Sequence, residues 1–133
     1  MDNFIKSLAG KKFEHGEDLE SEALIVAQKI LVNEGMDFIP HSYSSFLKVY
    51  NGIKRDGAYL FGATIDDDLD IIDKNKEMIK PEASLLLGYN EFDLLVFNYK
   101  IKKYQIVDRE DFDIIDEYNE DEISYALGQI FNV

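Results

Sequence analysis

Three apolar segments separated by very short polar connections constrain the fold of this chain more than any other feature. The segments ASLLLGYN, DLLVFNYK and KYQIVDR span residues 83–90, 93–100 and 103–109 and are rich in residues that favour strands. The connections at 91–92 and 101–102 are too short for the crossover of about a dozen residues that parallel strands require. The sequence therefore predicts an antiparallel meander joined by hairpins.

Two amphipathic helices are predicted before this meander. Residues 17–34 place apolar side chains at spacings of three and four, and Gly35 ends the pattern. That stripe consists of Leu19, Ala23, Val26, Ala27, Ile30 and Leu31. A second helix starts near Pro40, carries Tyr43, Phe46, Leu47 and Tyr50 on one face, and stops at Asn51-Gly52.

The rest of the chain supplies further strands and a closing helix. The segment AYLFG at 58–62 follows the loop IKRDG and is typical of a strand, and DFDIIDEY at 111–118 is a further candidate. Asn119 suits the N-cap of a final helix, with Glu122 three residues later. The buried stripe expected there is Ile123, Ala126, Leu127, Ile130 and Phe131.

These elements predict an α+β fold in one domain over residues 1–133. The length and a hydrophobic content of 46% are sufficient for a single core. We expect the N-terminal helices and the C-terminal helix to pack on one face of a largely antiparallel sheet of about four to six strands.

Acidic residues dominate the composition and are unevenly placed. The chain has 14 basic and 27 acidic residues, for a net charge of -13, and residues 63–133 hold 18 of the acids but only 7 of the bases. The acids concentrate in DDDLDIID at 66–73 and in DREDFDIIDEYNEDE at 108–122. Such charge disfavours direct binding to nucleic acid or to a membrane. Solubility through self-repulsion is the simpler explanation for it.

Recognisable catalytic and metal-binding patterns are missing from the sequence. There is no cysteine, only His15 and His41 are available as imidazole ligands, and no hydrolase, nucleotide or metalloprotease motif occurs. Residues 66–77 partly match a calcium loop, but Ile71 stands where that loop requires glycine. We therefore expect no enzyme activity, no cofactor and no dedicated metal site, and a cytoplasmic protein without a signal or membrane segment.

A family resemblance rests on the order of several short motifs. Pro40, Tyr43, Phe46-Leu47, Asn51-Gly52 and LFG at 60–62 resemble the pattern LP-x-x-Y-x-x-FL...NG...G...LFG of the SUKH superfamily. The similarity is best between residues 18 and 62. The sequence departs from the pattern at Ile39, where leucine is commoner, and in having no tryptophan.

The resemblance implies a non-enzymatic binding domain related to fungal cell-wall assembly regulators and to bacterial immunity proteins. We expect an immunity protein that binds and neutralises a cognate toxin with a basic surface, such as a nuclease, and that is itself a monomer or a weak dimer. The motif residues 51–52 and 60–62 are interpreted as scaffold. The carboxylates expected to face the toxin are Asp66, Asp67, Asp68, Asp70, Asp73, Asp108, Glu110, Asp111 and Asp113.

Two other classes of function stay open at this point. A scaffold or regulatory module, similar to the fungal relatives, would recognise endogenous proteins without a neighbouring toxin gene. An enzyme would need a pocket with carboxylates of perturbed pKa.

Overall fold

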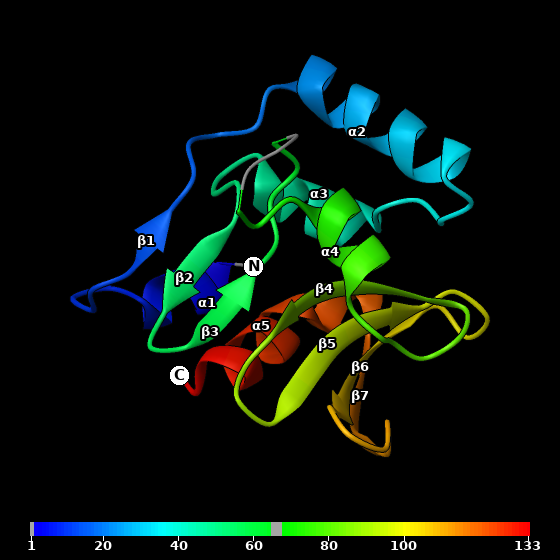
Figure 1. Cartoon of the computed structure of the whole chain (residues 1–133). Helices are drawn as coiled ribbons and strands as arrows, with labels where there is room; N and C mark the ends of the chain where they lie inside the picture. Colours follow the sequence, from blue (N-terminus) through cyan, green and yellow to red (C-terminus); the bar gives the residue numbers. More distant parts are fainter. Residues whose placement is uncertain (1, 65–67) are drawn as a thin grey trace.

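The computed structural model describes residues 2–64 and 68–133, and its elements form an α+β fold (Figure 1). The helices are α1 (Asp2–Ser7), α2 (Ser21–Asn33), α3 (His41–Leu47), α4 (Ile71–Glu77) and α5 (Ile123–Phe131), with a short 3-10 turn η1 (Glu120–Glu122) before the last. The strands are β1 (Glu14–His15), β2 (Ile53–Arg55), β3 (Ala58–Leu60), β4 (Ser84–Tyr89), β5 (Asp93–Asn98), β6 (Lys103–Asp108) and β7 (Ile114–Asn119).

The strands form one antiparallel sheet in chain order from β1 to β7, which confirms the predicted meander. The sheet has seven strands, so the expectation of four to six was too low. The segment IKRDG is not a loop, because Ile53–Arg55 is β2. Asp56 and Gly57 form its tight turn to β3, both with positive φ, as the commonest two-residue hairpin loops require.

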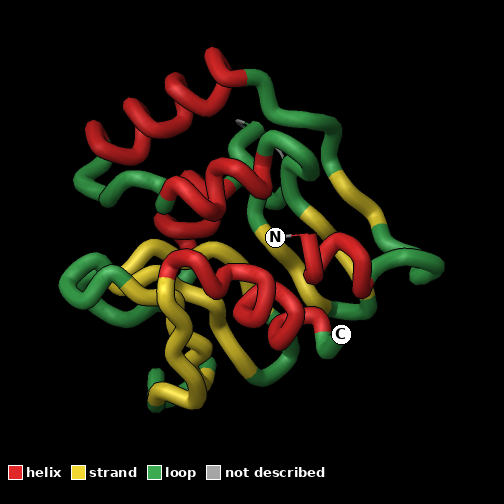
Figure 2. The backbone as a smooth tube through the Cα atoms, turned by 180° about the vertical axis from the view of Figure 1, so that it is seen from behind, coloured by secondary structure: helices red, strands yellow, loops and turns green. Residues whose placement is uncertain are grey.

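Both faces of the central strands are buried. Residues 84–88, 94–97 and 104–107 are buried without interruption, although successive side chains of a strand point to opposite faces. Figures 1 and 2 show α5 and α1 along one side of the sheet, and Figure 1 shows α2, α3 and α4 above β4.

The helix stripes were predicted with different success. The predicted residues of α5 are all buried, and so are Tyr43, Phe46 and Leu47 of α3. In α2, Ala27 and Leu31 are buried, but Ala23 and Val26 are exposed. The apolar residues of α2 spread over two faces, because Ile25 and Val32 point outward as well. Within the part of the chain described, no helix has the length and apolar character needed to cross a membrane.

Candidate partner-binding surface

The turn between β6 and β7 gathers four of the predicted carboxylates in one place. Asp108 ends β6, and its Oδ1 accepts hydrogen bonds from the N–H groups of Glu110 at 2.8 Å and Asp111 at 3.3 Å. The Asp111 carboxylate in turn accepts from the N–H of Asp113 at 2.9 Å. These aspartates shape the turn that carries them, since short acidic side chains satisfy backbone donors in this way.

The outer side chains of this turn are available to solvent. Glu110, Asp111 and Asp113 are exposed, and Asp108 is half-buried. The exposed carboxylates continue along β7 through Asp116 and Glu117. We call the carboxylates of residues 108–117 the acidic hairpin; they are Asp108, Glu110, Asp111, Asp113, Asp116 and Glu117.

Arg109, the single basic residue of this segment, points away from the carboxylates of the acidic hairpin. The Arg109 guanidinium donates from Nη1 to the carbonyl oxygen of Asn90 at 2.9 Å and lies 4.9 Å from the centre of the Tyr89 ring. Arg109 thus joins the β6–β7 turn to the neighbouring β4–β5 turn. Its charge is directed toward that turn, so the face of the hairpin stays acidic.

Asp93 on β5 adds a carboxylate directly across from Asp108. The two residues are cross-strand partners in the antiparallel register. Burial, and secondly the negative charge of Asp108, raise the pKa of Asp93 above its ordinary value. Strand pairing therefore brings Asp93 next to the acidic hairpin, although the two are far apart in the sequence.

The first predicted acidic cluster has a different character. Asp66 and Asp67 lie outside the described residues. The Asp68 side chain is 88% exposed and lies 3.8 Å from Lys54 Nζ. Asp70 is only 1% exposed, and its Oδ1 accepts from the N–H of Ile72 at 3.0 Å at the start of α4. Asp70 is therefore an N-cap, and its burial contradicts the expectation that it faces a partner.

The structure does not bring the two acidic clusters together. Asp73 lies partly buried in the first turn of α4, and Figure 1 shows α4 above β4 and β5. The β6–β7 turn is at the bottom of both views. A partner surface built from both clusters is therefore not supported, and the acidic hairpin is the better candidate.

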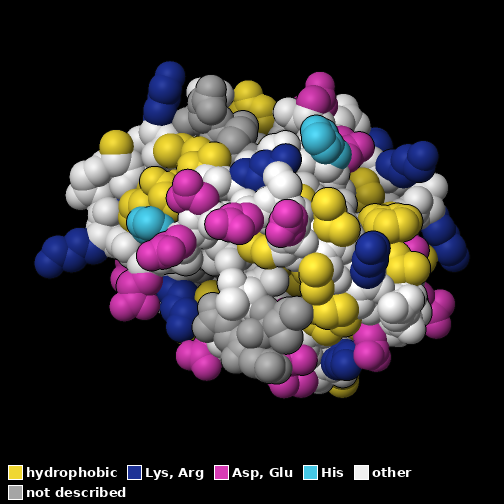
Figure 3. Space-filling view, turned by 90° about the horizontal axis from the view of Figure 1, so that it is seen from above, with side chains coloured by type: hydrophobic (Ala, Val, Ile, Leu, Met, Phe, Trp, Pro, Cys, Tyr) yellow, Lys and Arg dark blue, Asp and Glu magenta, His cyan; other side chains and the backbone are white. Residues whose placement is uncertain are grey.

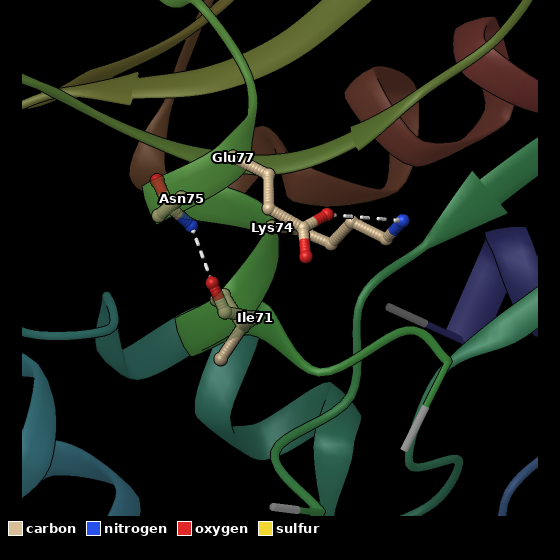
Figure 4. A network of polar contacts seen from close by, with 4 residues as sticks. All are labelled: Ile71, Lys74, Asn75 and Glu77. Atoms are coloured by element: carbon tan, nitrogen blue, oxygen red, sulfur yellow. Dashed lines mark hydrogen bonds and ion pairs between the residues drawn. The ribbon is translucent and has the colours of Figure 1, made fainter. Parts of the chain in front are cut away.

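Helix α4 also occupies the region of the partial calcium-loop match. Figure 4 shows Asn75 donating to the carbonyl oxygen of Ile71 at 2.8 Å and Lys74 paired with Glu77 at 3.9 Å. Asn75 also bonds to the backbone of Leu86 on β4. Residues 71–77 are thus a helix fixed to the sheet rather than half of a cation-binding loop. Across the described residues, no three acidic or histidine side chains form a group suited to a metal ion.

The residues of the family-like motif make structural contacts. Asn51 Oδ1 accepts from the N–H of Ala63 at 2.7 Å. Gly62 packs so closely against this residue that a Cβ would lie 2.6 Å from the Asn51 carbonyl oxygen. The Tyr43 hydroxyl donates to the carbonyl oxygen of Phe61. These contacts support the interpretation of the motif as scaffold that fixes α3 against β3.

Two hollows lie away from the acidic hairpin. One, of about 330 Å³, is lined by residues that include His15, Asn51 and Lys54. His15 Nδ1 lies 2.8 Å from the carbonyl oxygen of Gly16. The other, of about 580 Å³, is an open groove on α2 lined by residues that include Ile25, Val32 and Phe38. Figure 3 shows apolar side chains beside acidic and basic ones on the face that carries α2.

Comparison with known proteins assigns this chain to no family. No family model matches the chain, and no curated protein matches it.

Several exposed residues in and beside the acidic hairpin were absent from the predicted partner set. Asp116, Glu117, Ile114 and Ile115 all lie exposed on β7. The sequence shows their acidity and their strand character, but not that β7 lies at the edge of the sheet. Edge position depends on which strands pair, which is a property of the whole sheet.

Proposed function

We propose that this chain is a non-enzymatic immunity protein of SUKH type that binds and neutralises a cognate toxin with a basic surface, such as a nuclease. The observation that supports the proposal is the acidic hairpin, where exposed carboxylates gather and the one arginine is engaged elsewhere. The contacts of Asn51, Gly62 and Tyr43 are consistent with the family-like motif as a scaffold.

The physical basis of the proposal is electrostatic complementarity. A nuclease holds phosphates in a basic cleft, and a dense group of carboxylates can occupy the same cleft in place of the substrate. Opposite fields also accelerate the encounter of the two proteins. We assign the toxin-facing surface to Asp108, Glu110, Asp111 and Asp113, extended by the acids of β7.

The first test is co-expression with the product of the adjacent upstream gene. We expect this chain to rescue growth and to co-purify with that product. Rescue without a stable complex, or a complex without rescue, would contradict neutralisation by direct binding.

The second test locates the surface on this chain. The triple variant E110Q/D111N/D113N should lower the association rate by about tenfold at low salt and make binding less sensitive to salt. The matched control E17Q/D18N/E20Q removes the same charge from exposed residues before α2. Equal losses in the two variants would show that net charge, and not the acidic hairpin, drives association.

A further inference from the structure

The outer edge of β7 is exposed along almost its whole length. Within the described residues, β7 pairs with β6 alone and ends the sheet. Five of its six residues are exposed, and Tyr118 is half-buried. Figures 1 and 2 show the hairpin it forms with β6 extending below the helices. An edge of this kind presents backbone N–H and C=O groups that another strand can pair with.

Two isoleucines stand at the start of this edge. Ile114 is 55% exposed and Ile115 is 48% exposed, next to a register irregularity opposite Ile106 and Val107. Proteins usually protect an edge strand with charged residues, proline or a bulge. The bulge and the acids fit such protection, but two exposed isoleucines do not, because they offer apolar area for a further strand to cover.

The charge of the edge limits what that strand can be. Residues 108–122 hold nine acids and one base, Arg109, which is bound to the β4–β5 turn. Pairing with the β7 edge of a second copy would bring the same acids face to face across two strands, and like charges in such positions are destabilising. A basic segment would instead place opposite charges beside Asp116, Glu117 and the acids of the turn.

We propose that β7 binds an extended, basic segment of a protein partner as an additional strand of the sheet. Backbone hydrogen bonds to the β7 edge would supply affinity, while Ile114 and Ile115 offer apolar contacts on opposite faces of the strand and the flanking acids contact lysine or arginine. The inference rests on the proposed function in using the same acidic surface. It adds the manner in which the partner is recognised.

The experiment uses a peptide of about eight residues that alternates lysine and valine, matched to the length of a typical strand. A second peptide has the same composition but alternates L- and D-residues, which preserves its charge and prevents a regular strand. Fluorescence anisotropy measures the binding of each to the full chain, and hydrogen exchange measures the protection of the β7 amides.

We expect the all-L peptide to bind at least about tenfold more tightly than the mixed peptide, since several backbone hydrogen bonds are lost in the latter. The β7 amides should gain protection only with the all-L peptide. The variant I114S/I115S should weaken binding, whereas V32S, which changes an exposed apolar residue of α2, should not. Circular dichroism of both variants verifies the fold.

Equal binding of the two peptides, or no binding of the all-L peptide, would overturn strand addition. The first result would leave the acidic hairpin as a charged surface, so the immunity proposal would survive it. Failure of the upstream gene product to co-purify would instead overturn the immunity proposal, whatever the peptides show. The two ideas therefore fail on different measurements.

Discussion

At the scale of single residues, two buried tyrosine hydroxyls differ in their hydrogen bonding and therefore in their expected contribution to stability. The Tyr43 hydroxyl donates to the carbonyl oxygen of Phe61 and lies 3.2 Å from that of Leu87, so it links α3 to β3 and β4. Burial, with a lesser contribution from Tyr104, raises the pKa of Tyr43. The buried Tyr99 hydroxyl has no hydrogen-bond partner in the described part of the structure, and burial raises its pKa too.

Removing each hydroxyl should therefore have opposite consequences. Tyr43→Phe leaves the buried Phe61 carbonyl oxygen without the Tyr43 donor, while that of Leu87 keeps the N–H of Phe61 at 2.8 Å, and should lower the free energy of unfolding by about 1–3 kcal/mol. Tyr99→Phe removes an unsatisfied polar atom and should leave the free energy of unfolding unchanged or raise it by about 1 kcal/mol. Urea denaturation of both variants measures the difference. Similar losses in the two would refute this account of their hydrogen bonds.

At the scale of secondary-structure elements, acidic residues have distinct roles that composition does not separate. Asp70 caps α4 through the N–H of Ile72, and Glu122 accepts from the N–H of Asn119 at 2.8 Å in the capping box before α5. Both stabilise helix starts, where negative charge is favourable. Asp93 and Asp108 are instead placed opposite each other on β5 and β6, where like charges oppose the pairing of the strands.

This cross-strand pair predicts a pH-dependent gain in stability for Asp93→Asn. The pKa of Asp93 is raised in the folded state, first by burial and then by Asp108, so ionisation of Asp93 costs stability as pH rises from its unfolded to its folded pKa. The penalty is complete above the folded value and absent below the unfolded one. Asp93→Asn should raise Tm by about 1–3 °C near neutral pH and leave it nearly unchanged at about pH 3.

The control for this prediction is Glu91→Gln, which removes one charge from an exposed residue of the adjacent turn. A gain from Asp93→Asn that is as large in acid as at neutral pH would contradict an electrostatic origin. An equal gain in Tm from Glu91→Gln would show that the lower net charge, and not the Asp93–Asp108 pair, causes the stabilisation.

At the scale of the whole molecule, the charge of -13 opposes the compact state. The four ion pairs found among the described residues are long, between 3.3 and 3.9 Å, and most of their carboxylates are well exposed. Exposed pairs of this kind contribute little. Repulsion among the acids, concentrated at the acidic hairpin, should therefore be the larger electrostatic effect.

Added salt should accordingly stabilise the fold. Between about 0.01 M and about 0.5 M NaCl, screening shortens the range of repulsion severalfold, and we expect Tm to rise by a few degrees. The variant E110Q/D111N/D113N should show a smaller rise, because three of the clustered charges are gone. A Tm that falls with salt would indicate that attraction between opposite charges outweighs repulsion.

Local patterns were sufficient for the elements whose signals are strong. The meander at 83–109 has long apolar segments and very short connections, and it was predicted nearly to the residue. The stripes of α3 and α5 were predicted because their apolar residues occupy a single face. The missed elements α1, β1, β2 and α4 are short, with only two to seven residues each, and their stability depends on neighbours distant in sequence.

The fold class, the antiparallel order of the central strands and the acidic character of the second half of the chain could be predicted from the amino-acid sequence, since they follow from periodicity, connection length and composition. Tertiary structure alone decided which carboxylates share a surface. It buried Asp70 as a helix cap, separated α4 from the β6–β7 turn, and placed β7 at the edge of the sheet. Exposure and proximity depend on packing between distant segments, and no local pattern encodes that packing.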